Sequence, residues 1–150
     1  MTTWTDKKFN DLTPHELYAL LQLRSEVFVV EQNCVFPDMD DKDQQSHHLM
    51  AWQGDKLAAY ARIVPPGISY VEFSIGRIVS SPSVRGQGIG RVLVSKGIQL
   101  AYSLHGKGII RIGAQYYLRG FYESFGFQKA GDIYLEDGIE HIEMLLLMKD

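Results

Sequence analysis

Apolar side chains recur with helical spacing in the stretch that follows Thr13. Thr13 is placed to cap a helix that begins at Pro14, and Glu16 is placed to reach back to the cap, as in a capping box. The face behind this start repeats every three or four residues and consists of Leu17, Leu20, Leu21, Arg24, Val27 and Phe28. The pattern predicts a helix over about 14–28, with a short strand, TWTDKKF, before it.

Strand patterns and two further helices fill the rest of the chain. Residues 48–63 form a predicted hairpin around Gly54-Asp55, and β-branched and aromatic residues predict one long strand over 68–81. The remaining predicted elements are a helix ending at about His105, a strand at 109–115, a short helix at 117–125, and two strands within 132–148 around Asp137-Gly138. This order favours an α/β sheet layered with helices over a bundle or a sandwich.

Composition narrows the class of protein. A chain of 150 residues that is 45% hydrophobic and 22% charged is typical of one soluble domain with a single core, so we expect one domain over 1–150. There is no apolar run of transmembrane length, the N-terminus has no signal-peptide pattern, and Cys34 is the only cysteine. These features predict a cytoplasmic protein without disulfides or membrane partners.

Charge is unevenly distributed, although the formal net charge is only −3. The stretch 73–122 contains no Asp or Glu and carries Arg77, Arg85, Arg91, Lys96, Lys107, Arg111 and Arg119. The stretch 31–43 has the opposite bias, with Glu31, Asp38, Asp40, Asp41 and Asp43 against Lys42. The first bias indicates an anionic ligand and the second the approach of a cation, while ordinary solvated faces are the alternative for both.

The glycine-rich loop at 86–90 carries the most specific chemistry. A strand that runs through such a loop into a helix collects free backbone amides at the positive end of the helix dipole, where a phosphate binds well. Glycines keep Cβ atoms away from the anion, and the flanking Arg85 and Arg91 can add charge-assisted contacts. The spacing matches neither a dinucleotide fingerprint, which needs an acid about 20 residues on, nor a Walker loop, which needs a lysine.

The loop reads R-x-x-G-x-G from Arg85 to Gly90 and resembles the coenzyme A loop of the GNAT N-acetyltransferases. A second segment, F-Y-E-x-x-G-F from Phe121 to Phe127, resembles the helix that follows the fifth strand in that superfamily. The segments RSEVFVVEQNCVFPDMDDKD, HHLMAW, GRIVSSPSVRG and YLEDGIEHIEM look like the ElaA-type subfamily and occur in the right order over nearly the whole chain.

The resemblance implies a fold and a cosubstrate. The expected fold is a mixed, mostly antiparallel sheet of about seven strands with helices on both faces, splayed between the fourth and fifth strands. Acetyl-CoA is the expected acyl donor. No metal is expected, because His47 and His48 have no Cys or acid partners at ligand spacing. Its diphosphate is expected on Gly86, Gln87, Gly88, Ile89, Gly90 and Arg91, and its pantetheine on Ile78, Val79 and Ser80. Gln115 stands where the superfamily commonly has asparagine, so its expected cofactor contact has a different reach.

The resemblance also implies catalytic roles. Tyr122 is expected to protonate the departing thiolate, with an ordinary core aromatic as the alternative. Glu72 is expected to deprotonate the amine, because strand alternation without a bulge places it on the face of Ile78, while a solvent-facing glutamate is the alternative. His47, His48, Glu31 and His141 are further candidates for the base that the sequence does not separate.

Other residues stay open at this level. Arg24, Phe28, Glu31 and Gln32 resemble a family signature at the end of the first helix, which implies a place in the acceptor pocket, with a core position as the alternative for Phe28. Cys34 is expected to be a structural thiol rather than a nucleophile, since no base is placed to activate it.

The expected reaction is direct acetyl transfer to a primary amine in a ternary complex, with a backbone amide near Val79 polarising the thioester. The alternatives are a longer acyl-CoA, an oxygen acceptor, or a non-catalytic module that binds or senses coenzyme A. A nucleic-acid partner is not expected, because the basic residues flank a loop and form no stripe. A homodimer through the C-terminal strands is an open possibility.

Overall fold

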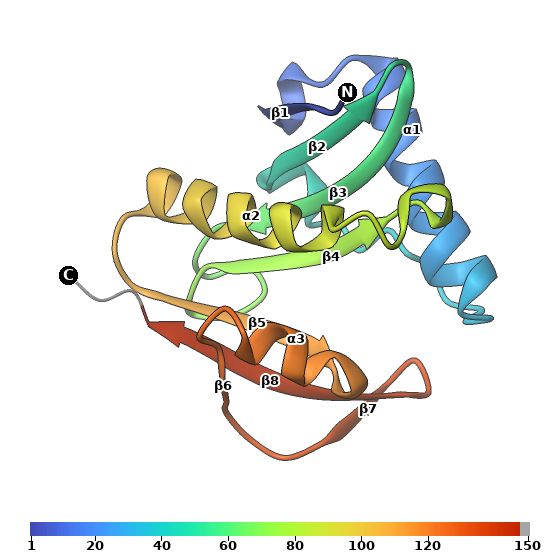
Figure 1. Ribbon diagram of the computed structural model, residues 1–150. Coiled ribbons are helices and arrows are strands. Elements are labelled where there is room, and N and C mark those ends of the chain that lie inside the picture. The colour runs from blue at the N-terminus through green and yellow to red at the C-terminus, as the bar shows by residue number, and fades with distance from the viewer. Residues whose placement is uncertain (148–150) are drawn as a thin grey trace.

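The computed structural model describes residues 1–147, which form two antiparallel sheets (Figure 1). The first sheet has the order β1 (Thr3–Lys8), β2 (His47–Gln53), β3 (Lys56–Val64) and β4 (Ser74–Ser80). The second has the order β5 (Ile109–Gln115), β8 (Ile139–Leu147) and β6 (Gln128–Lys129), and β7 (Tyr134–Glu136) also pairs with β8. The predicted α/β class is confirmed, and the two-residue β6 is a strand that the sequence did not indicate.

The two sheets meet only at one end. Phe73 and Ile110 form an isolated parallel bridge, and the Arg111 amide donates to the Phe73 carbonyl at 3.1 Å. Beyond this point β4 and β5 diverge toward the side where α1 ends and α2 begins (Figure 1). This opening confirms the predicted splay between the fourth and fifth strands.

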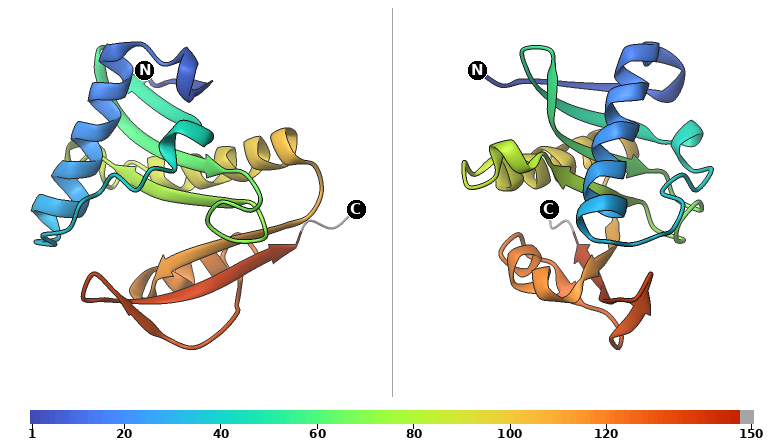
Figure 2. Two further views of the ribbon diagram at one scale, coloured as in Figure 1. Left: turned by 180° about the vertical axis from the view of Figure 1, so that it is seen from behind. Right: turned by 90° about the vertical axis from the view of Figure 1, so that its right-hand side faces the viewer.

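Helices cover both faces of the first sheet, as predicted. The helix α1 (Pro14–Arg24) packs on one face and α2 (Ile89–His105) on the other (Figure 2). Residues 57–64 of β3 are all buried, and they serve both faces of the sheet: Ala61 and Ile63 belong to the core under α2, whereas Tyr60 belongs to the core under α1. The short α3 (Arg119–Glu123) packs against the second sheet. The remaining helical turns are η1 (Phe9–Asp11), η2 (Ser25–Glu31), η3 (Asp43–Gln45), η4 (Pro82–Val84) and η5 (Tyr116–Leu118).

The start of α1 is the predicted capping box. The Glu16 amide donates to Thr13 Oγ1 at 3.1 Å, and the Thr13 amide donates to Glu16 Oε1 at 2.8 Å. The α-helix ends at Arg24 instead of residue 28, and the chain continues as the π-helical η2. The spacing of apolar side chains is similar in an α-helix and in a π-helix. The sequence pattern therefore predicted that the helix continues, but not that it changes from α to π.

The long strand predicted over 68–81 is shorter and bulged. It begins at Ser74, and its register on β3 jumps from Arg62–Gly76 to Tyr60–Val79, so that Arg77 and Ile78 share one position. Arg77 has a φ of +50°, which a non-glycine residue rarely adopts. The bulge reverses the alternation. The alternation of residues 72–80 was expected only for a strand without a bulge, and β4 does not meet that condition.

Candidate active site

A cavity of about 460 Å³ occupies the opening between the two sheets. Residues 75–80 of β4 and 112–115 of β5 form two of its sides. Residues of η2, the loop that follows it, and the turn between β7 and β8 close the ends. The cavity thus lies where the β4 edge has no strand partner on β5 among residues 74–80.

The loop between β4 and α2 presents free backbone amides. Within the described residues, none of the amides from Gly86 to Arg91 donates a hydrogen bond to another protein group, and the first donor of the helix is Val92, to the Gly88 carbonyl. Gly86 and Gly88 have φ values of +84° and +78°, and the space that a Cβ would take at either residue has no neighbouring atom within 4 Å. A cradle of this kind fits a diphosphate, because the donors converge at the positive end of α2.

Gly88 allows a test of this cradle with a matched control. We expect Gly88→Val to weaken acetyl-CoA binding at least 10-fold in calorimetry, because a side chain there would hold the diphosphate away from the amides. Gly54 in the β2–β3 turn has a φ of +62° and equally open space. Gly54→Val should cost a similar stability, about 1–2 kcal/mol, without loss of affinity. Equal affinities for the two variants would contradict the phosphate role.

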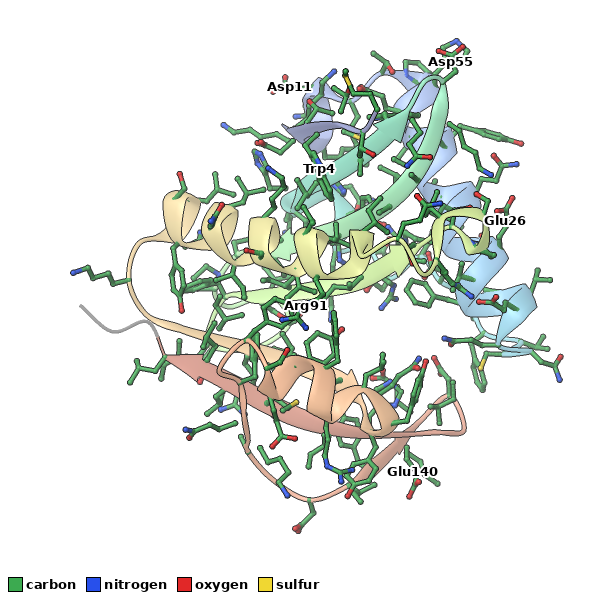
Figure 3. The ribbon with its side chains drawn as sticks, viewed as in Figure 1. Trp4, Asp11, Glu26, Asp55, Arg91 and Glu140 are labelled. Carbon is green, nitrogen blue, oxygen red and sulfur yellow. The ribbon has the colours of Figure 1, made fainter. Side chains whose placement is uncertain are left out.

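The arginines beside the loop already have protein partners. Arg85 forms a bidentate ion pair with Glu31 of η2, at 2.6 and 2.7 Å, and its guanidinium also donates to the Ser80 carbonyl. Arg91 points from α2 toward α3, where it donates to Ser124 Oγ and lies 4.8 Å from the Phe125 ring centroid (Figure 3). The contacts of both arginines with an anion stay predictions.

Several predicted residues line the cavity together. Ile78, Val79 and Ser80 lie on its β4 side, Gln115 at the end of β5, and Tyr122 on α3. Gln115 Nε2 donates to Gln32 Oε1 at 3.3 Å, which links β5 to the residue after η2. The structure therefore brings the proposed pantetheine strand and the proposed acid to one space.

Tyr122 is buried, with 7% of its surface exposed, and its ring packs edge-on against Phe121 and Phe127. Its hydroxyl forms no hydrogen bond with another described residue. Burial raises the pKa of Tyr122 to about 12, with a smaller contribution from Tyr117. The phenol is therefore protonated at neutral pH, and Tyr122 is one of the residues that line the cavity.

Glu72 was expected on the same face as Ile78, but it does not line the cavity. It precedes β4, and its carboxylate pairs with Arg111, at 3.0 Å to Nε and 3.2 Å to Nη2. The Arg111 guanidinium holds the pKa of Glu72 below its ordinary value. The geometry that motivated Glu72 as the base required an unbulged strand, and β4 does not provide one.

The acidic segment is neutralised inside the protein. Asp38 pairs with Arg24 and Arg77, Asp43 with Arg24 and Arg62, and Asp40 with Arg62 and Arg77. These three carboxylates of the stretch 31–43 are therefore paired within the protein, which contradicts the interpretation that they attract a cation from outside. Arg24 is fully buried and does not line the cavity, whereas Phe28, Glu31 and Gln32 do.

The candidate bases separate by position. His47 pairs with Asp6 on β1, and His48 is buried between the Tyr60 hydroxyl and the Asp43 carbonyl, at 2.6 and 2.9 Å. Neither lines the cavity, whereas Glu31 and His141 do. Cys34 also lines it, and its thiol contacts the carbonyls of Gln32 and Asp137.

Metal-binding clusters and membrane-spanning helices are both missing from the described part of the chain. Within residues 1–147, no group of three or more His, Cys, Asp or Glu side chains is arranged to hold a metal ion. Over the same residues, no helix combines the length and the apolar character needed to cross a membrane.

Comparison with known proteins places this geometry in a family. A family model described as an acetyltransferase (GNAT) domain matches residues 10–148. ElaA of Escherichia coli is 41% identical over 146 residues, which cover 96% of this chain and 95% of ElaA. Its crystal structure superimposes with a TM-score of 0.92 at 40% identity, covering 97% of this chain and 99% of that one. An acyl-CoA N-acyltransferase from Pseudomonas aeruginosa gives a TM-score of 0.94 at 44% identity, with the same coverage. The chain therefore belongs to the GNAT acetyltransferases, a family of transferase enzymes, and within it to the ElaA-type proteins.

Proposed function

We propose that residues 1–150 act as one domain that transfers an acetyl group from acetyl-CoA to a primary amine, directly and within a ternary complex. The observation that carries this proposal is the row of free amides at Gly86–Arg91, next to a cavity that opens along the unpaired edge of β4. The amides bind the diphosphate, and residues 78–80 bind the pantetheine by their exposed strand edge.

The cavity residues then act on the reacting groups. A β4 amide near Val79 donates to the carbonyl oxygen and stabilises the charge that develops there. Tyr122 donates its phenolic proton to the sulfur as the carbon–sulfur bond breaks with its electron pair on sulfur. The nitrogen forms the new amide bond, and the proton that it loses restores Tyr122. Burial raises the pKa of a thiol as it raises the pKa of a phenol. The pKa values of the tyrosine and of the departing thiol therefore stay similar in this cavity, and proton transfer between them remains balanced.

The test is calorimetry with acetyl-CoA together with a thiol-release assay. The amine panel contains spermidine, an aminoglycoside and a short peptide with a free α-amino group. We expect 1:1 binding of acetyl-CoA and amine-dependent release of coenzyme A. Binding without turnover of any amine would favour a non-catalytic coenzyme A module instead. Turnover only with a longer acyl-CoA would point to a different acyl donor, and turnover only with alcohols would point to an oxygen acceptor.

A further inference from the structure

His141 occupies a position in the cavity wall that the proposed reaction leaves without a role. The residue lies near the start of β8, opposite Gln115 of β5, and 7% of its surface is exposed. The residue lines the cavity between the two sheets. A polar ring at this depth is held by specific contacts, since burial without hydrogen bonds is costly.

Those contacts select one form of the neutral ring. Nδ1 lies 2.8 Å from the Ile139 carbonyl oxygen, which can only accept a hydrogen bond. Nδ1 therefore carries the proton, and Nε2 of the neutral ring bears the lone pair. An imidazole fixed in this way presents a basic nitrogen in a defined direction.

A carboxylate stands beside that nitrogen. Glu136 Oε2 on β7 lies 3.5 Å from His141 Nε2. An ionised carboxylate cannot donate a proton to Nε2, so an ion pair between the two forms only when Nε2 has accepted a proton. The pair thus combines a free lone pair with a group that stabilises the product of proton uptake.

Other charged groups around the cavity are less suited to this role. Both oxygens of Glu31 bind Arg85. The Arg85 guanidinium lowers the pKa of Glu31, and this effect exceeds the opposing effect of burial. Asp38 binds Arg24 and Arg77. Tyr134 lies beside the ring, with 5.7 Å between the two ring centroids, and Asp137 in the β7–β8 turn and Tyr122 on α3 line the same cavity. Both tyrosines have pKa values raised by burial and are neutral.

We propose that His141 Nε2 is the general base that removes a proton from the acceptor ammonium, and that Glu136 is its positioning residue. The inference rests on the proposed function. One proton passes from the R–NH3⁺ group to Nε2, which leaves a neutral amine with a free electron pair for attack, and the imidazolium later returns that proton to solvent. Tyr122 and His141 thereby serve opposite ends of the transfer.

The kinetic test compares His141→Gln with the wild-type protein over pH 5.5–9. General bases contribute about 10²-fold or more, so we expect kcat/KM for the amine to fall about 100-fold at pH 7 while acetyl-CoA binding changes less than 2-fold. Raising the pH should partly rescue His141→Gln, because the amine then loses its proton to solvent. Glu136→Gln should give a smaller loss, which appears in kcat and not in the KM for acetyl-CoA.

His47→Gln is the matched control. His47 Nε2 lies 2.6 Å from Asp6 Oδ1, so it is also a histidine paired with a carboxylate, but it lies outside the cavity. Its replacement should leave the profile unchanged. Retained turnover and an unchanged profile in His141→Gln would overturn the inference while the proposed function stands. Absence of turnover in the wild-type protein with every amine would overturn both.

Long-range ¹H–¹⁵N spectra of the imidazoles give a readout that needs no substrate. We expect the neutral His141 ring to carry its proton on Nδ1, assigned by its absence in His141→Gln. A neutral ring protonated on Nε2 would overturn the inference, because Nε2 then has no lone pair with which to accept a proton.

Discussion

Tyr122→Phe is expected to lower kcat of amine acetylation by about 10²–10³-fold, within the range of general acid catalysis, and to leave the Kd for acetyl-CoA within 2-fold. The ring packs in the core between Phe121 and Phe127, so phenylalanine keeps the volume and the edge-on contacts. Only the hydroxyl of this cavity-lining residue is lost, and it has no partner among the described residues. The loss should therefore appear in turnover and not in folding.

Tyr102→Phe is the control for this change. The Tyr102 hydroxyl is also buried without a hydrogen-bond partner, but it belongs to α2 and does not line the cavity. Its removal should leave kcat unchanged. The measurement is steady-state thiol release at saturating acetyl-CoA, with calorimetry for the Kd. Equal turnover in Tyr122→Phe and the wild-type protein would remove Tyr122 from the mechanism and leave it as a core aromatic.

Features decided by neighbouring residues were predictable from the sequence. The capping box at Thr13, the two-residue turns at Gly54-Asp55 and Asp137-Gly138, and the glycine loop all depend on residues within a few positions of one another. Their chemistry is local, so a single sequence displays it. The end of the predicted C-terminal strand, Met148, lies outside the described residues.

Features decided by distant contacts were not predictable. The Arg77 bulge appears only in the pairing of β4 with β3, and it displaced Glu72 from the expected face. The partners of Asp38 are 14 and 39 residues away along the chain, at Arg24 and Arg77. A charge run in the sequence shows the sign of the charges and not what neutralises them. In the sequence, His141 was one of several candidate bases. Its position in the cavity wall, which His47 and His48 do not share, distinguishes it from them only in the structure.

Arg24→Met is expected to destabilise the protein by about 3–5 kcal/mol, the cost typical of removing one partner from a buried ion pair. Arg24 is fully buried, donates to Asp38 at 2.6 Å and to Asp43 at 2.7 Å, and lies over the Tyr60 ring. Methionine fills part of the space but leaves both carboxylates with one arginine each. Asp38 also binds Arg77 at the bulge of β4, so Arg24 and Asp38 connect α1 to the cavity wall. Loss of Arg24 should therefore affect both.

The measurement is urea unfolding at pH 7, with Lys7→Met as the control. Lys7 forms a more exposed ion pair with Glu16 at 3.0 Å, so its loss should cost less than about 1 kcal/mol. Arg24→Lys should fall between the two, because one ammonium cannot reproduce the bidentate reach of a guanidinium.

Burial opposes ionisation of Asp43, but Arg24 and Arg62 outweigh it and lower its pKa. A lowered carboxyl pKa contributes stability that is present above the unfolded-state value, about 3.9, and is lost as the pH falls below it. The difference between wild-type and Arg24→Met should accordingly shrink in acid, whereas a difference that stays constant down to about pH 2, well below that reference value, would show that the arginine acts through packing alone.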